Sequence, residues 1–210
     1  MNTNLRSKVW AIATEVRNHG GRALMVGGCV RDEILGLDPK DIDLEVYSIE
    51  PNFLREILEG FGNVDCVGES FKVYKLSWDD DDIRYEMDIS IPREDKKEGV
   101  GHKGFVVTGN PNASFEDAAR RRDFTINAIM KDALTGEYID PFNGIVDIKN
   151  KFIRVVDPIH FVEDSLRVLR AMQFASRFGF TIEDSTIELC RSIDLRDLPK
   201  ERIWEEFEKM

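Results

Sequence analysis

Residues 41–46 alternate strictly between acidic and apolar side chains, which leaves little choice of local structure. The apolar positions are Ile42, Leu44 and Val46, and the acidic positions are Asp41, Asp43 and Glu45. Side chains of a strand point alternately to its two faces, so the segment predicts a half-buried strand with an acidic face. Carboxylates at i and i+2 lie roughly 6.5–7 Å apart, which suits two divalent ions about 3.5–4 Å apart. Asp41 and Asp43 are therefore candidate metal ligands; taken alone, an Asp-x-Asp pair is more often plain solvated surface.

The segment before this strand predicts helix, strand, glycine turn and short helix. The first helix carries apolar residues at helical spacing, namely Leu5, Val9, Ile12 and Val16, and Gly20-Gly21 is its expected stop. A buried strand is predicted at 23–26 and a brief helix at 30–35, with Gly36 as its C-cap. Gly27-Gly28 between them lets backbone N–H groups approach a phosphate chain beside Arg31. The alternative is a tight turn in which Arg31 pairs with Asp32 or a surface acid.

Downstream of residue 50 the pattern predicts a helix starting at Pro51, then strands at 71–78 and 83–91. In the second of these strands Asp88 falls on the polar face, which makes it a third candidate carboxylate. The alternative for Asp88 is a solvated strand residue. Residues 92–104 are polar and rich in glycine, and we expect a long mobile loop there.

The second half of the chain carries helical patterns, and the architecture shifts from mixed α/β to all-α near Asp157. Ser114 and Asp117 form a capping-box pattern before a helix that runs into Arg120–Arg122. The apolar spacing over 161–178 predicts one helix that ends at Gly179, and only helical patterns follow. The chain closes inside an apparent helix at 204–210 with no cap, which is typical of a truncated domain.

Composition excludes several classes of protein. The net charge of −11 argues against nonspecific nucleic-acid binding over the whole surface, because phosphate contacts need clustered cations. Such clusters are local, at Arg120, Arg121 and Arg122 and at Arg167, Arg170 and Arg177. The three cysteines and three histidines are scattered, so neither a disulfide framework nor a zinc site is predicted. No apolar run spans a bilayer and no secretory signal is visible, so we expect a cytoplasmic protein without membrane contact.

Three motifs occur in a fixed order. The first is Gly27-Gly28-Cys29-Val30-Arg31-Asp32 with Gly36 and Asp41-Ile42-Asp43, the second is Arg121-Arg122-Asp123-Phe124-Thr125-Ile126-Asn127-Ala128, and the third is Glu163-Asp164-x-x-Arg167-x-x-Arg170. Together with Asp140-Pro141-Phe142-Asn143-Gly144 they cover nearly the whole chain. This set resembles class II CCA-adding enzymes and bacterial poly(A) polymerases, the tRNA nucleotidyltransferase branch of the polymerase β-like superfamily.

The resemblance implies an α+β fold. Residues 1–156 would form the polymerase β-like nucleotidyltransferase head, a mixed β-sheet flanked by helices. Residues 157–210 would form an all-α neck that recognises the nucleobase. The body and tail domains of the family, which grip the acceptor RNA, have no counterpart in this sequence.

The resemblance also implies roles for residues. Two Mg²⁺ ions would be held by Asp41 and Asp43, with Asp88 as the carboxylate that activates the attacking hydroxyl. The nucleotide-binding residues would be Gly27, Gly28, Arg31 and Arg122 at the triphosphate, Asp123 and Asn127 at the sugar, and Asp164, Arg167 and Arg170 at the base. Where many relatives have another arginine, this chain has Gln173, which cannot supply the same charge.

The third motif also has a physical rationale of its own. On a helix, Asp164 and Arg167 at i and i+3 are neighbours and present one acceptor beside one donor. Cytosine and adenine each offer an amino donor beside a ring-nitrogen acceptor, so this pair favours C and A. The alternative is an ordinary surface salt bridge, worth about 0.3–0.5 kcal/mol.

The expected function is template-independent addition of C and/or A nucleotides to the 3′ end of tRNA, with CTP and ATP as donors and pyrophosphate as product. A poly(A) polymerase, or an enzyme that adds only CC or only A, shares the same head motifs and stays open. From a different class, a noncatalytic nucleotide-binding module that regulates a partner also stays open. Transfer to a small molecule such as an antibiotic is disfavoured, because the second and third motifs fit the RNA-acting family.

Overall fold

The computed structural model describes residues 3–39, 41–67, 73–80, 83–97, 105–196 and 198–210. Its helices are α1 (Thr3–Asn18), α2 (Gly28–Ile34), α3 (Pro51–Glu59), α4 (Phe115–Arg120), α5 (Gly144–Asn150), α6 (Pro158–Phe161), α7 (Leu166–Phe178), α8 (Asp184–Arg191) and α9 (Lys200–Glu208), with a 3-10 turn at Thr125–Asn127. Its strands are β1 (Arg22–Val26), β2 (Asp43–Tyr47), β3 (Asn63–Val67), β4 (Val73–Asp80), β5 (Ile83–Ser90), β6 (Arg93–Lys97), β7 (Phe105–Gly109), β8 (Met130–Asp132), β9 (Tyr138–Ile139), β10 (Phe152–Ile153) and β11 (Thr181–Ile182).

The chain divides into two compact units. The first unit holds residues 1–118 and 130–139, and the second unit holds residues 119–129 and 140–210. The predicted division into a head, residues 1–156, and a helical neck, residues 157–210, stays a prediction. No helix among the described residues is both long and apolar enough to cross a membrane.

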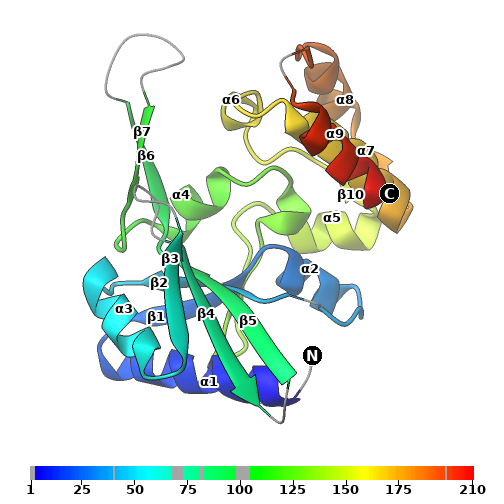
Figure 1. The fold of residues 1–210 in the computed structure, drawn as a ribbon. Helices are drawn as coiled ribbons and strands as arrows, with labels where there is room; N and C mark the ends of the chain where they lie inside the picture. The colour runs from blue at the N-terminus through cyan, green and yellow to red at the C-terminus, as the bar shows by residue number, and fades with distance from the viewer. Residues whose placement is uncertain (1–2, 40, 68–72, 81–82, 98–104, 197) are drawn as a thin grey trace. The chain divides into compact units, whose positions relative to one another are not determined.

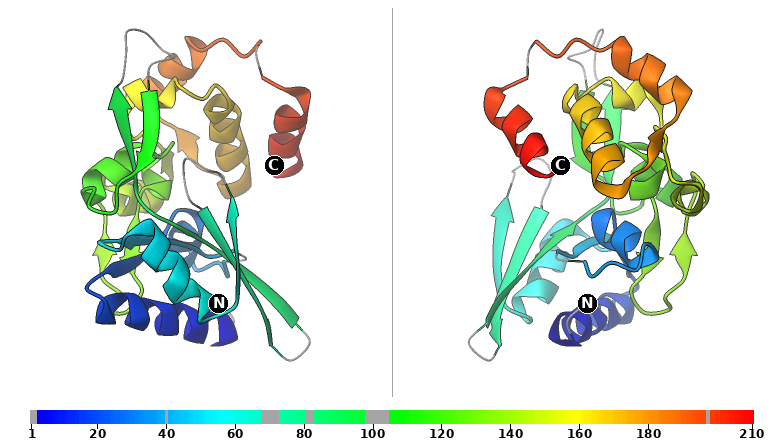
Figure 2. Two further views of the ribbon diagram at one scale, coloured as in Figure 1. Left: turned by 60° about the vertical axis from the view of Figure 1, so that its left-hand side comes forward. Right: turned by 90° about the vertical axis from the view of Figure 1, so that its right-hand side faces the viewer.

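The first unit is built on a seven-stranded sheet with the order β3-β4-β5-β2-β1-β8-β9. β2 and β5 run parallel, whereas the other neighbouring pairs are antiparallel. The helices α1 and α3 lie next to each other against this sheet, α1 at β1 and α3 at β3 (Figures 1 and 2). The predicted α+β class with a mixed sheet flanked by helices is therefore confirmed.

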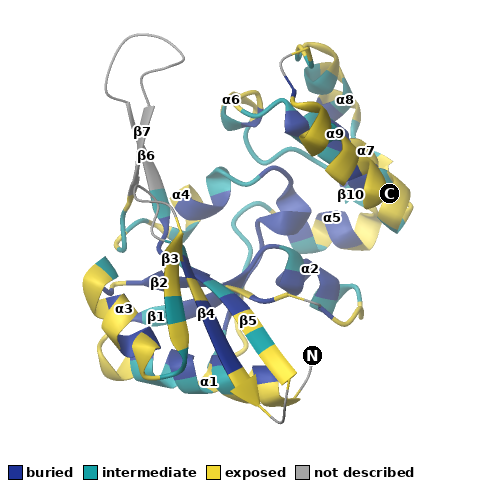
Figure 3. Cartoon of the chain, in the orientation of Figure 1, coloured by how far each residue is buried: buried dark blue, intermediate teal, exposed yellow. Residues whose placement is uncertain are grey.

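The apolar face of β2 lies in the core of the first unit. Ile42, Leu44 and Val46 are all buried, as the alternating pattern predicts. The strand itself begins at Asp43, two residues later than the pattern indicates, and Asp41 lies just before it. On the opposite face Glu45 is buried too, because its carboxylate accepts a hydrogen bond of 2.6 Å from the hydroxyl of Tyr47. Figure 3 shows β1 and β2 as buried over almost their whole length.

The expectation of a long loop over residues 92–104 is wrong for its first part. Residues 93–97 are not part of a loop but pair as β6 with β7, in a register that joins Arg93 to Gly109. Residues 98–104 lie outside the described part of the chain. A polar strand of this kind carries no apolar alternation, so its sequence gives no strand signal; backbone pairing with β7 alone defines it.

The helix predicted over 161–178 is interrupted. The structure has the short α6 and the longer α7, with residues 162–165 between them. In this turn the Oδ1 atom of Asp164 accepts a hydrogen bond of 3.1 Å from the backbone N–H of Leu166. Such a local bond offers the backbone an alternative to the helical ladder, which explains the break. The predicted stop is confirmed, because Gly179 adopts a left-handed conformation with φ 64° that a residue with a Cβ rarely takes.

The second unit has its own aromatic core. Phe124 packs edge-on against Phe161 and Phe174, with ring centroids 5.6 and 5.8 Å away. A smaller cluster of Leu166, Leu169 and Leu198 lies beside it, and α7 contacts α9. From residue 157 onward the described elements are α6 to α9 and the two-residue β11, which pairs with β10.

Candidate active site

The acidic residues of β2 and β5 are brought side by side by the parallel pairing of these two strands. Asp43 and Asp88 are direct partners in the register, so both side chains leave the sheet on the same face. Asp43 is exposed and Asp88 half-buried. Asp41 is also exposed and lies two residues before Asp43. The structure thus places Asp43 and Asp88 side by side on the polar face, with Asp41 just before β2.

A lysine that sequence reasoning missed extends this row across the sheet. Lys75 of β4 is the register partner of Asp88, and its ammonium lies 3.9 Å from the Asp88 carboxylate. On the far side, Lys75 pairs in register with Asp65 of β3. The row therefore reads Asp65, Lys75, Asp88, Asp43, and we call it the charged row. The alternation around buried Tyr74 and Leu76 could have placed Lys75 on the polar face, but only the strand pairing reveals which acid it meets.

The carboxylate oxygens of Asp43 and Asp88 suit a hard divalent cation. Carboxylate oxygens are the ligands that Mg²⁺ prefers, and Mg²⁺ is usually bound by one or two carboxylates together with substrate phosphates and water. Within the described residues no three His, Cys, Asp or Glu side chains are close enough to form a complete cage. The residues present therefore suit an ion that arrives with a nucleotide better than an ion held by the protein alone.

The predicted phosphate turn has the expected backbone. β1 ends at Val26, Gly27 has φ 72° and ψ −131°, and Gly28 begins α2. A Cβ atom placed on Gly28 would lie 3.5 Å from the Nη2 atom of Arg31, so this backbone runs directly beside the guanidinium. Arg31 is buried and bonds the Asp32 carboxylate at 2.8 and 2.6 Å. The structure thus contains the Arg31–Asp32 pair that was the alternative for this motif; the phosphate role stays a prediction.

In the second unit, three predicted site residues form one buried network. The Oδ1 atom of Asp123 accepts hydrogen bonds from the Phe124 N–H at 2.8 Å and from the Asn127 amide at 2.9 Å. Its Oδ2 atom accepts from Nε of Arg170 at 2.7 Å. Burial alone would raise the pKa of Asp123, but Arg170 and these donors outweigh it and hold the pKa below its usual value. Asp123 is therefore an anion that fixes Asn127 and Arg170 in place.

Arg122 and Arg167 flank this network. Arg122 is half-buried just after the end of α4. The guanidinium of Arg167 donates to the backbone carbonyls of His160 at 2.5 Å and of Arg121 at 2.9 Å. Two of its five N–H groups are engaged in this way, so the side chain is oriented while donor capacity is left over.

The expected neighbouring pair of Asp164 and Arg167 on one helix is wrong in its geometry. Asp164 lies in the turn before α7, and its Oδ2 atom accepts a hydrogen bond of 3.1 Å from Arg202 of α9. Asp164 and Arg167 still share one turn, because the Arg167 N–H donates to the Asp164 carbonyl at 3.0 Å, but the carboxylate pairs with Arg202 instead of Arg167; the base-reading role stays a prediction. Gln173, the departure from the family pattern, is buried and donates from Nε2 to the Lys209 carbonyl at 3.2 Å.

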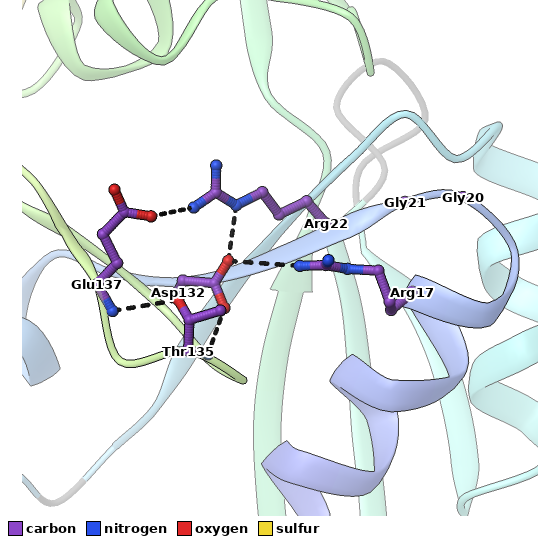
Figure 4. Close-up of a pocket in the computed structure, with 7 residues that line it drawn as sticks. All are labelled: Arg17, Gly20, Gly21, Arg22, Asp132, Thr135 and Glu137. Atoms are coloured by element: carbon purple, nitrogen blue, oxygen red, sulfur yellow. Dashed lines mark hydrogen bonds and ion pairs between the residues drawn. The ribbon is translucent and has the colours of Figure 1, made fainter.

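A separate open pocket of about 480 Å³ lies at the start of β1, and none of the predicted site residues lines it. Figure 4 shows Arg22 pointing toward Asp132, with Nε to Oδ2 at 2.6 Å, and Arg17 reaching the same carboxylate from α1 at 3.8 Å. Arg22 also meets Glu137 at 3.1 Å. Arg17 and Arg22 thus balance the charges of Asp132 and Glu137, and these ion pairs lie at the turn between β8 and β9.

Comparison with known proteins gives a consistent picture. Residues 23–154 match the family described as Poly A polymerase head domain. A Bacillus stearothermophilus CCA-adding enzyme in complex with CTP is 29% identical, with a TM-score of 0.81 over 100% of this chain and 49% of that chain. A Thermotoga maritima CCA-adding enzyme complexed with tRNA is 27% identical, with a TM-score of 0.80 over 100% of this chain and 47% of that one.

A CCA-adding enzyme in complex with ATP is 26% identical, with a TM-score of 0.78 over 100% of this chain and 47% of the other. The chain spans about half the length of these structures. Its family match includes the first two motifs and the charged row, which are the features that define the candidate site. The chain belongs to the Poly A polymerase head-domain family of nucleotidyltransferases.

Proposed function

We propose that this chain is the catalytic head of an enzyme that transfers C and/or A nucleotides from CTP and ATP to the 3′ end of tRNA, releases pyrophosphate and works in the cytoplasm. The observation that carries the proposal is the pairing of Asp43 with Asp88 on adjacent parallel strands, inside the segment that matches the family. Similar structures were determined with CTP, ATP and tRNA, which supports the choice of substrates.

The proposed chemistry is phosphoryl transfer assisted by two Mg²⁺ ions. Asp41 and Asp43 would hold the ions, whose charge would polarise the α-phosphate and ease deprotonation of the attacking 3′-hydroxyl. Asp88 would receive the proton of that hydroxyl or orient it. Asp41, Asp43 and Asp88 would act only as oxygen ligands and as proton acceptor, and no covalent intermediate is needed.

Nucleotide binding is assigned to two groups of residues. The backbone at Gly27 and Gly28, with the guanidinium groups of Arg31 and Arg122, would hold the triphosphate. Asp123 and Asn127 would set the position of the sugar through their shared network, and Asp164, Arg167 and Arg170 would address the base. A donor and an acceptor presented together match the pairing edges of cytosine and adenine.

The decisive experiment replaces one carboxylate without changing its shape. We expect Asp43→Asn to lower the rate of nucleotide transfer at least about a hundredfold, because the amide loses the charge that binds Mg²⁺. The assay follows pyrophosphate release with an RNA acceptor and titrated Mg²⁺. Asp65→Asn is the matched control, since Asp65 lies in the same charged row two strands away from Asp43.

Full transfer by Asp43→Asn, or none by the unaltered chain, would rule out catalysis at this site. The second outcome would favour the noncatalytic nucleotide-binding module. Poly(A) addition is a second candidate because the matching family is described by that activity. Sequencing the products from tRNA lacking its 3′ end, with each NTP alone and with all four, separates CCA addition, partial addition and poly(A) addition.

A further inference from the structure

The helix α9 places one stripe of residues along the segment that is assigned to the base. Arg202, Glu206 and Lys209 follow each other at i, i+4 and i+7, so they lie on one face of the helix. Arg202 bonds Asp164 at 3.1 Å, and Glu206 lies 4.0 Å from Nη1 of Arg170. The views in Figure 2 agree that α9 lies beside α7, to which Arg170 belongs.

Glu206, in the middle of this stripe, is buried, and the contacts around it hold α9 in its place. Glu206 is only 3% exposed, although it carries a carboxylate. Its Oε1 atom accepts from the Lys209 ammonium at 3.0 Å and faces Arg170. Gln173, itself 1% exposed, donates to the Lys209 carbonyl, one of the carbonyls that a helix end leaves without an internal partner. Buried polar groups paired in this way are costly to separate, so α9 has a defined register against α7.

Arg202 projects from this anchored helix onto the Asp164 carboxylate. Both oxygens of Asp164 are then engaged: Oδ1 accepts from the Leu166 N–H at 3.1 Å, and Oδ2 accepts from Arg202. Each carboxylate oxygen has two acceptor sites, so Asp164 keeps capacity for a further donor such as an exocyclic amino group. An acceptor that is held from two sides is already oriented before a ligand arrives, which reduces the entropy lost on binding.

We propose that Arg202 is a positioning residue for nucleobase choice, which holds the Asp164 carboxylate ready to accept a hydrogen bond from the amino group of cytosine or adenine. The inference rests on the proposed function for the role of Asp164, and it goes beyond that function in naming a residue outside the three motifs. The inference also assigns a role to Gln173, whose amide bonds the C-terminal end of α9, the helix that carries Arg202.

The test is the nucleotide preference of Arg202→Gln in the full chain. We expect the ratio of kcat/KM for CTP and ATP over that for GTP and UTP to fall about fivefold, which is the upper range for a half-exposed ion pair. The loss should appear in KM for CTP and ATP while kcat changes little, because Arg202 touches no reacting group. Arg202→Lys should restore part of the preference.

A double-mutant cycle makes the test specific. In an Asp164→Ala background, Arg202→Gln should have no further effect on the preference, because the carboxylate that Arg202 positions is gone. Arg191→Gln is the matched control: Arg191 forms an exposed ion pair of 2.6 Å with Glu188 on α8, away from the motifs. An unchanged preference in Arg202→Gln, or an equal effect with and without Asp164, would overturn the inference.

Failure of the proposed function is recognised separately. If the unaltered chain transfers nothing from any NTP, calorimetry of CTP and GTP binding to that chain still measures base preference without turnover. A preference for CTP that weakens with Arg202→Gln supports the positioning role, and equal binding of both nucleotides contradicts it. If Arg202→Gln loses its fold, seen as a lowered melting temperature, the deciding measurement is the nucleotide preference of Arg202→Lys, alone and in the Asp164→Ala background.

Discussion

At the scale of single residues, Gly28 and Gly144 differ in the space that the structure leaves for an added methyl group. At Gly28 an added Cβ would meet only the Arg31 guanidinium at 3.5 Å, which is an ordinary contact. At Gly144 it would meet the backbone carbonyl of Thr125 at 2.1 Å, which neither side can relieve cheaply. The first glycine is thus not required by packing, whereas the second one is. Glycine at position 144 therefore has a structural reason, whereas the reason that we propose for glycine at position 28 is functional.

We expect Gly28→Ala to keep the melting temperature within about 3 °C of the unaltered chain, which corresponds to a change of about 1 kcal/mol in stability. KM for CTP and ATP should rise about tenfold, because the new methyl group blocks close approach of a phosphate to the backbone. Calorimetric melting and steady-state kinetics measure the two effects. Gly144→Ala is the comparison that should lose stability instead. Unchanged kinetics in Gly28→Ala would remove Gly28 from the triphosphate site.

Asp132 gives a prediction for pH. Burial raises its pKa, but the N–H groups of Thr135 and Leu134 and the Arg22 side chain outweigh this, so the folded pKa lies below the ordinary 3.8. A depressed folded pKa stabilises the fold above the unfolded pKa, and this contribution is lost as pH falls through the folded value. We expect the free energy of unfolding to decline on acidification below pH 3.8.

The measurement is urea unfolding as a function of pH for the unaltered chain and for Asp132→Asn. The variant should be less stable by about 2 kcal/mol at neutral pH, because a charged acceptor of several hydrogen bonds is lost. The difference between the two chains should shrink as pH drops below the unfolded pKa. A difference that is independent of pH would show that Asp132 does not titrate as described.

At the scale of elements, the sequence predicts what depends on local periodicity. α1, the turn from β1 to α2 at Gly27 and the helix α3 starting at Pro51 were all predictable, because each has an apolar face or a start or stop residue. The break between α6 and α7 was not, since the apolar spacing continues across it while one side chain, Asp164, ends the ladder locally. The polar strand β6 was also beyond prediction, because its residues show no apolar alternation.

The same limit applies to the candidate site. Asp41, Asp43 and Asp88 were found from alternation within single strands, but Lys75 was not, because its meaning depends on the pairing of β4 with β5. The partners of Asp123 and Asp164 likewise come from distant segments, Arg170 and Arg202. Residue type and spacing identify which groups carry chemistry, whereas their partners follow only from the fold.

Lys75 of β4 gives a prediction about the Mg²⁺ concentration that the site requires. Its ammonium competes with a divalent ion for the Asp88 carboxylate and repels cations near the charged row. We therefore expect Lys75→Met to lower the Mg²⁺ concentration that gives half-maximal transfer, by about threefold for a half-exposed charge pair. Mg²⁺ titration at fixed CTP measures this. Lys149→Met on α5 is the control for a general change in net charge. A raised Mg²⁺ requirement in Lys75→Met would mean that Lys75 helps the site instead.

At the scale of the whole molecule, the two units are interleaved along the chain. The backbone passes from one to the other at 118/119, 129/130 and 139/140, so neither unit is a continuous piece of sequence. Residues 119–129 carry Phe124, Ile126 and Ile129, each 0% exposed, and belong to the second unit. The strands β8 and β9, which follow them, complete the sheet of the first unit.

We expect a fragment of residues 1–139 to fold poorly for this reason. It keeps every strand of the seven-stranded sheet but leaves the apolar side chains of 119–129 without their core, at about 1.5–3 kcal/mol for each large side chain. Binding of an apolar dye and size-exclusion chromatography should reveal exposed surface and association, with the full chain as the control. A monomeric fragment that melts cooperatively and binds no dye would contradict this interpretation.

The parallel pairing of β2 with β5 has a consequence for variation among related chains. Two strands that run in the same direction need a long connection, here residues 48–82, which includes α3, β3 and β4. Insertions at the surface turns of this connection leave the register of Asp43 opposite Asp88 untouched, whereas a shift of one residue within either strand turns its carboxylate to the opposite face. Lengthening is therefore tolerated between the two strands and forbidden inside them.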